Sequence, residues 1–229
     1  MKLVLFDIDG TLLLSDGAGR RAIHRALIEV FGDTGPKDYW FDGKTDPQIV
    51  RDLMRVVGHD DDRIDRDMEP LLSRYVEYLR EELHAPGHDP RPLPGVPELL
   101  DALESRSDVV LGLLTGNIEP GARAKLEAVG IEPSRFRVGA FGSDHAHRPE
   151  LPAIARERTR ARLGVHVSGD SVVVIGDTPA DLTCGSAIGA RAIGVATGRF
   201  SMDQLREYRP AAVFRDLSDT DAVLYSIVQ

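Results

Sequence analysis

The segment MKLVLFDIDGTL, residues 1–12, runs an apolar strand directly into two aspartates. Residues 2–6 predict a buried β-strand, and Asp7 and Asp9 follow it with one residue between them. Side chains two positions apart in an extended backbone point the same way, so we expect both carboxylates to face one side. Because two adjacent carboxylates repel each other unless a cation lies between them, the pattern favours a hard divalent ion such as Mg²⁺.

Five further apolar runs resemble this first strand, and helical patterns separate most of the later ones. They are residues 109–114, 136–141, 171–176, 190–196 and 211–214. Near-continuous apolar strands that alternate with helices are typical of a parallel sheet covered on both faces. We therefore predict an α/β fold with a Rossmann-like parallel sheet, whose ligand binds beyond the carboxyl ends of the strands.

The stretch of residues 16–92 has a different pattern, because its apolar residues recur with helical spacing and no convincing strand interrupts them. We expect helices here, one of them introduced by Asp46 as N-cap and Pro47 as first helical position. A proline-rich segment then returns the chain to the sheet. The sequence thus predicts a catalytic core of residues 1–15 and 93–229, with residues 16–92 inserted as an all-helical cap.

A second acidic segment, GDTPAD (176–181), ends another predicted strand. Thr178 and Pro179 are typical of an N-cap and a first helical position. This places Asp177 in the turn between strand and helix, and Asp181 about one turn into the helix. If this strand end lies beside the first one, Asp177 can complete a metal site with the two aspartates there.

A third strand end, LLTGN (113–117), carries hydrogen-bond donors instead of acids. The Thr115 hydroxyl and the amides of Gly116 and Asn117 are suited to phosphoryl oxygens. Taken alone, each of these polar residues is common in turns. Three such segments at the ends of apolar strands, however, meet where an α/β sheet places its ligand.

The segments DIDGT (7–11), LLTGN (113–117) and GDTPAD (176–181) resemble the first, second and fourth motifs of the haloacid dehalogenase superfamily. The resemblance extends over nearly the whole chain, includes a type 1 helical cap, and is strongest to the phosphoglycolate phosphatase-like branch. It implies phosphoryl transfer through an aspartyl-phosphate with Mg²⁺ as cofactor. In such chemistry the protein mainly positions groups and neutralises charge.

The resemblance implies a role for each motif residue. Asp7 is the implied nucleophile, and Asp9 the acid that protonates the leaving oxygen and then the base that activates water. Mg²⁺ would be held by Asp7, the main-chain carbonyl of Asp9 and Asp177, with Asp181 in support, while Thr115 and the nearby amides hold the transferring group. Dehalogenases and phosphonate-cleaving members lack an aspartate at the position of Asp9, so its presence favours phosphate esters.

The third motif departs from the family pattern, which has a lysine there. The matching segment, HAHRPELP (145–152), has Arg148 instead. Arginine keeps the positive charge but presents it on a planar fork. We expect Arg148 to take the role of the lysine, bridging phosphate and nucleophile; the alternatives are Arg156 and Arg158 in the following helix.

In the cap, FDGKTDP (41–47) brings Lys44 within reach of the predicted crevice. A cap over a phosphate site needs a cation, so Lys44 is a candidate for binding the anionic or polar end of the substrate, and Arg20 is a weaker one. The alternative is that both are solvated surface charges.

Composition narrows the function further. The 229 residues carry a net charge of −9 with no concentrated basic stripe, which argues against a nucleic-acid partner. The single cysteine, Cys184, excludes an intrachain disulfide and fits a reducing compartment. No apolar segment approaches membrane-spanning length. We expect a cytoplasmic protein, monomer or homodimer, with no membrane partner.

Together these features predict a Mg²⁺-dependent phosphatase that hydrolyses a small phosphorylated metabolite, a phosphoglycolate-like ester or a sugar phosphate. One alternative is a phosphomutase of the β-phosphoglucomutase type, which keeps both aspartates but returns the phosphoryl group to a sugar. Another is a phosphoryl-binding module without turnover, and the intact set of Asp7, Asp9, Thr115 and Asp177 argues against it.

Overall fold

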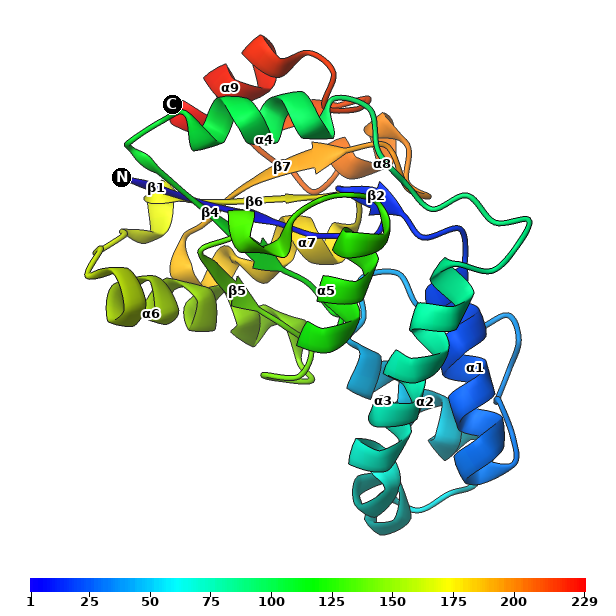
Figure 1. Ribbon diagram of the computed structural model, residues 1–229. Helices are drawn as coiled ribbons and strands as arrows, with labels where there is room; N and C mark the ends of the chain where they lie inside the picture. Colours follow the sequence, from blue (N-terminus) through cyan, green and yellow to red (C-terminus); the bar gives the residue numbers. More distant parts are fainter.

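The computed structural model describes residues 1–229 and contains a six-stranded parallel sheet in the order β5-β4-β1-β6-β7-β8 (Figure 1). Its strands are β1 (Lys2–Phe6), β4 (Val109–Leu114), β5 (Val138–Ala140), β6 (Val172–Gly176), β7 (Arg191–Val195) and β8 (Ala212–Phe214). Each of the six apolar runs contains one of these strands, and all neighbouring strands are parallel. The predicted α/β fold is therefore confirmed.

Helices cover both faces of the sheet, because alternate residues of the central strand face opposite ways. Val4 and Phe6 of β1 join an apolar cluster with α4 (Val96–Glu104), α5 (Glu119–Ala128) and α9 (Thr220–Val228). Leu3 and Leu5 join a second cluster with α6 (Leu151–Leu163) and α7 (Pro179–Cys184). The short helix α8 (Met202–Arg206) packs against the last two strands. Burial on both faces explains why the strands are apolar throughout.

The inserted segment forms a lobe of three helices beside the sheet (Figure 1). These are α1 (Ala18–Phe31), α2 (Asp46–Val56) and α3 (Asp61–Leu83), and they share one apolar cluster. The chain enters and leaves the lobe through an antiparallel ribbon of β2 (Leu13–Leu14) and β3 (Arg91–Pro92). Ile118 and Ala124, near and within α5, pack among the lobe's apolar residues, so lobe and core are in contact. The exact division into core and cap stays a prediction.

The start of α2 differs from the predicted one. Thr45, not Asp46, is the N-cap, and its hydroxyl accepts a hydrogen bond from the Gln48 amide at 3.3 Å. The same hydroxyl donates to the Ala146 carbonyl at 2.8 Å, which fixes Thr45 at the border of lobe and core. Either residue type can cap a helix. Because Thr45 does so here, the Asp46 carboxylate is left for another contact.

Cys184 is buried at the end of α7 and forms no disulfide. Burial raises the pKa of its thiol to about 12, so the group stays protonated and packs as a small apolar side chain. None of the helices has the combination of length and apolar character that is needed to cross a bilayer.

Candidate active site

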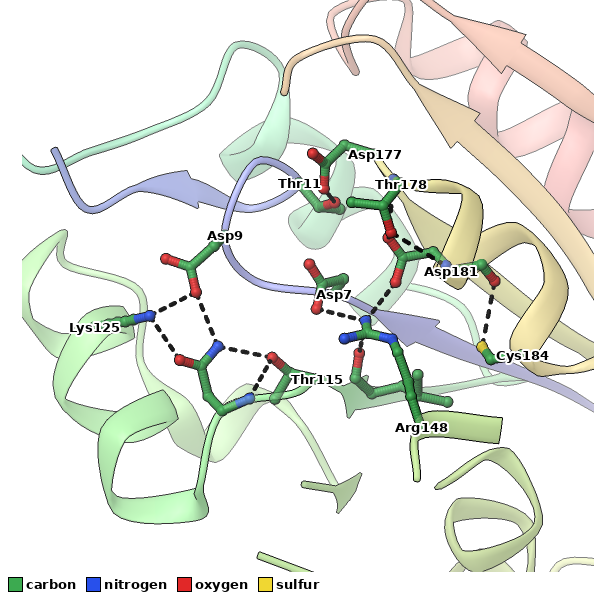
Figure 2. A network of polar contacts seen from close by, with 12 residues as sticks. Asp7, Asp9, Thr11, Thr115, Lys125, Arg148, Asp177, Thr178, Asp181 and Cys184 are labelled. Carbon is green, nitrogen blue, oxygen red and sulfur yellow. Dashed lines mark hydrogen bonds and ion pairs between the residues drawn. The ribbon is translucent and has the colours of Figure 1, made fainter. Parts of the chain in front are cut away.

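Three adjacent strands bring the predicted motifs together. Because β4, β1 and β6 are neighbours in the sheet, the residues after them, Thr115, Asp7 and Asp177, meet at one edge (Figure 2). All three are buried. The Asp7 amide donates to the carbonyl of Ile175 at 3.0 Å, which extends the sheet register by one residue and fixes the position of the carboxylate.

Arg148 reaches this edge from a short turn and points its guanidinium at Asp7 (Figure 2). Its Nη2 lies 2.8 Å from Asp7 Oδ1, also contacts Asp181, and donates to the Leu114 carbonyl at 3.3 Å. Burial disfavours the charge, but the two carboxylates outweigh it and raise the pKa of Arg148 further. Only one nitrogen of the fork makes contacts, and the buried Nε has no partner. Arg148 thus acts here as a point charge.

The two alternative arginines lie elsewhere. Arg158 donates to Asp144 at 2.6 Å and to the Gly139 carbonyl at 2.7 Å. Arg156 borders a separate surface cavity. Neither lines the cavity that contains Asp7.

Asp7, Asp177 and Asp181 form a buried acidic cluster whose oxygens lie within 4.8 Å of one another. Burial raises the pKa of Asp7 to about 7, although Arg148 opposes the shift. Burial, together with the charges of Asp181 and Asp7, raises the pKa of Asp177 well above its usual value. One arginine therefore does not neutralise these three carboxylates. An all-oxygen donor set with unbalanced negative charge fits a hard divalent cation.

The oxygens of Asp181 and Asp177 are not equally free. Asp181 Oδ2 accepts from the Thr178 amide at 3.0 Å and from its hydroxyl at 2.6 Å, completing the capping box of α7, while Oδ1 contacts Arg148. Asp177 accepts only from the Thr11 hydroxyl, at 3.2 Å. A Cβ on Gly10 would stand 2.5 Å from Asp177 Oδ2, so this close approach requires glycine. Asp177 therefore has the more accessible oxygen.

Asp9 is turned toward the other side of the site, away from Arg148 (Figure 2). It accepts hydrogen bonds from Ser15 at 3.0 Å, Asn117 at 2.9 Å and Lys125 at 2.6 Å. Burial alone would raise the pKa of Asp9, but the Lys125 charge and these hydrogen bonds lower it below its usual value. Asp9 is thus an ionised carboxylate in this arrangement.

Lys125 is one of the site residues that the sequence reasoning missed. It belongs to α5, is 4% exposed, and its Nζ lies 2.6 Å from both Asp9 Oδ2 and Asn117 Oδ1. The Asn117 side chain in turn donates to the Thr115 hydroxyl at 2.8 Å. One signal was available: on a helix, Lys125 shares a face with Gly121 and Ala122, where a solvated lysine is not expected.

The lobe covers this site through the segment before α2. The Asp46 amide donates to the Gly116 carbonyl and its carboxylate accepts from the Ile118 amide, both at 2.8 Å. A Cβ on Gly116 would stand 2.0 Å from the Lys44 carbonyl, so Gly116 permits this approach. The Lys44 side chain borders the cavity, but its ammonium pairs with Asp52 at 2.9 Å and contacts Tyr39. Sequence reasoning identified Asp46 as a helix cap and not as a residue of the site.

Residues of the lobe and of the core together line a cavity of about 260 Å³. Its walls include the predicted residues Asp7, Asp9, Thr115, Arg148 and Asp177 from the core. From the lobe they include Gly19, Arg20, Lys44, Asp46 and Tyr75. Ligand pockets commonly measure about 300–1,000 Å³, so this cavity suits a small ligand.

A parallel sheet with a buried acidic cluster at its carboxyl edge and a covering helical lobe is the arrangement of an α/β enzyme whose ligand binds at the strand ends. A family model for haloacid dehalogenase-like hydrolases matches residues 4–186, and the chain belongs to this family. The superfamily expected from the sequence is confirmed, and so is the enzyme class, a phosphoric monoester hydrolase.

Two curated relatives match along most of their length. A 5'-nucleotidase of Pseudomonas aeruginosa is 28% identical over 97% of this chain and 95% of its own. A phosphoglycolate phosphatase of Rhodospirillum rubrum is 30% identical over 95% of this chain and 88% of its own. Among solved structures, a predicted phosphoglycolate phosphatase from Haemophilus somnus aligns with a TM-score of 0.70 at 22% identity, covering 98% of both chains. The structural match supports the fold.

Proposed function

We propose that this protein hydrolyses a small phosphate monoester through an aspartyl-phosphate on Asp7, with Mg²⁺ as cofactor. The observation that carries the proposal is the position of Asp7 in the cavity, with Arg148 at 2.8 Å from Oδ1. Asp7 Oδ2 makes no hydrogen bond within the chain, so it is free to attack phosphorus. Asp7, the Asp9 main-chain carbonyl and Asp177 would hold Mg²⁺, which would supply positive charge to neutralise the transferring phosphoryl group.

The remaining contacts fit the proposed roles of the neighbouring residues. The Thr115 hydroxyl accepts from the Asn117 side chain at 2.8 Å, so its own proton is free to donate to a phosphoryl oxygen. Arg148 provides a fixed positive charge beside the nucleophile. Both groups are buried, which strengthens their interaction with the charge of the transferring group.

Asp9 would transfer protons in both half-reactions. As an ionised carboxylate it suits the second one, in which it accepts a proton from the attacking water. In the first it must carry a proton to the leaving oxygen, so its bond to Lys125 has to loosen when substrate binds. Closer approach of the covering lobe to the core would keep bulk water out of the cavity.

Phosphate release from a broad panel of small phosphomonoesters, measured with Mg²⁺, tests the proposal. The wild type should release phosphate from at least one ester and the Asp7→Asn variant from none. Absence of release from the whole panel would contradict hydrolysis. Isomer formation that exceeds phosphate release and depends on a sugar bisphosphate would indicate the mutase alternative instead.

A further inference from the structure

At the Lys125 end of the cavity, three polar groups from three helices have hydrogen-bonding capacity that the chain does not use. The hydroxyl of Tyr75, on α3, makes no hydrogen bond within the chain, although the residue is only 1% exposed. Lys125 uses two of its three N–H groups, for Asp9 and Asn117. Asp46 uses one oxygen, for the Ile118 amide. All three line the cavity, so their free positions face a ligand.

Gly19 of α1 shows how close two of these groups lie. A Cβ there would stand 3.2 Å from Lys125 Nζ and 3.8 Å from the Tyr75 hydroxyl oxygen. The missing side chain therefore leaves room for a ligand atom beside both groups. Burial, with the charges of Asp46 and Asp9, raises the pKa of Tyr75, so the hydroxyl remains a donor at any physiological pH.

These groups offer both donors and an acceptor, which is what a substrate hydroxyl needs, since it donates one hydrogen bond and accepts others. A carboxylate only accepts. The Asp46 carboxyl on the same cavity wall would repel an anionic group of the substrate.

Two cations of the lobe, Lys44 and Arg20, also line the cavity. The Lys44 ammonium pairs with Asp52. The Arg20 guanidinium lies over the Phe41 ring at 3.9 Å and donates from Nη2 to the Tyr39 carbonyl at 3.0 Å, while its buried Nη1 makes no hydrogen bond. Neither cation is hydrogen-bonded to Tyr75, Lys125 or Asp46.

We propose that Tyr75, Lys125 and Asp46 bind hydroxyl groups of the leaving alcohol, so that the substrate is the phosphate ester of a small, uncharged polyol. This inference rests on the proposed phosphatase function and narrows it, because esters of hydroxy acids become poor substrates. The cavity of about 260 Å³ restricts the polyol to a few carbons.

Three esters with the same three-carbon skeleton test the inference: sn-glycerol 3-phosphate, propyl phosphate and 3-phosphoglycerate. They differ in carrying two hydroxyls, none, or one hydroxyl and a carboxylate. Measured with Mg²⁺, kcat/KM should be about tenfold or more higher for glycerol 3-phosphate than for each of the other two esters. A tenfold difference corresponds to the loss of about one hydrogen bond to the substrate.

The Tyr75→Phe variant removes the unpaired hydroxyl and nothing else. It should lower kcat/KM for glycerol 3-phosphate by about tenfold and leave kcat/KM for propyl phosphate within about twofold of the wild-type value. Tyr78→Phe, on the same helix but outside the cavity, is the matched control and should change neither value. Tyr75→Phe should also unfold at the wild-type temperature or above, because the hydroxyl has no partner to lose.

A preference for 3-phosphoglycerate, equal activity on all three esters, or an equal loss on all three in Tyr75→Phe would overturn the inference while leaving the phosphatase function intact. So would hydrolysis of other esters with none of these three accepted. Failure to release phosphate from any ester would instead contradict the function on which the inference rests.

Discussion

Replacing Arg148 by methionine or by lysine tests separately the positive charge and the planar shape of its side chain. Arg148 is the motif residue that departs from the family pattern. All of its contacts pass through one nitrogen, Nη2, which touches Asp7, Asp181 and the Leu114 carbonyl. Lysine keeps a single cationic nitrogen and removes the unpartnered Nε. Methionine fills a similar volume without charge. The two variants should therefore behave very differently.

The structure sets the expected magnitudes. Arg148 is 5% exposed, and removing one member of a buried ion pair costs about 3–5 kcal/mol. The pKa of Asp7 is already raised to about 7, so Asp7 can take up a proton when the arginine is lost. We therefore expect Arg148→Met to lose about 3 kcal/mol of stability, the lower end of this range. Loss of a cation aimed at the transferring group should lower kcat by about 10²–10³ for Arg148→Met. Arg148→Lys should lose no more than about 1 kcal/mol of stability and no more than about tenfold in kcat.

The assay combines kcat and KM for the best ester at saturating Mg²⁺ with urea unfolding of each variant. Arg158→Met is the matched control, because it removes an arginine that pairs with Asp144 at the edge of the same core. It should lose about 1 kcal/mol or less of stability and no activity. Wild-type kcat in Arg148→Met would refute the role given to this residue. A loss in Arg148→Lys as large as in Arg148→Met would refute its description as a point charge.

Four further changes have definite expected outcomes. Asp9→Asn should lower kcat on alkyl phosphates by about 10²–10⁴, and much less on p-nitrophenyl phosphate, whose leaving group needs no proton; equal losses would contradict its role as an acid. Burial raises the pKa of Asp46 from 3.8 to about 6. Between these pH values the folded state binds more protons than the unfolded state, so wild-type stability should fall relative to Asp46→Asn as the pH rises, by about 2.4 kcal/mol in urea unfolding between pH 4 and pH 7.5. Gly19→Ala should gain up to about 1 kcal/mol of stability from helix propensity. It should also raise KM, because the new methyl group would stand 3.2 Å from Lys125 Nζ and occupy space for the substrate. An unchanged KM would mean that the substrate binds elsewhere. Chelation should abolish phosphate release, and added Mg²⁺ should restore it and raise the unfolding temperature with its concentration.

The sheet could be predicted from the sequence because each of its central strands is buried on two faces. Leu3 and Leu5 face one apolar cluster and Val4 and Phe6 the other, so the whole strand must be apolar. The edge strand β5 pairs only with β4, over three residues, and is shorter than the apolar run that predicted it. The β2–β3 ribbon was not predicted, because two residues in each strand leave no periodic pattern.

The residues at the strand ends could be predicted for a related reason. Asp7, Thr115 and Asp177 follow strands whose order in the sheet places their ends side by side, so their meeting depends on topology and not on the details of packing. The reach of Arg148 to Asp7 was expected only from the resemblance to a family, because its turn is not part of the sheet. Its proposed role, like those of Asp7 and Asp9, is what the variants above test.

For site residues that lie on helices, the sequence contains no comparably strong signal. Whether the side chains of Lys125, Tyr75 and Asp46 meet depends on the rotation of three helices about their axes and on how closely the lobe approaches the core, which Gly116 permits. A motif at strand ends can therefore identify the reaction while the leaving group is recognised by residues that no motif contains. On this reasoning, chains that share the three motifs should differ in substrate mainly through the side chains that helices present to the cavity, and Gly19 is one such position here.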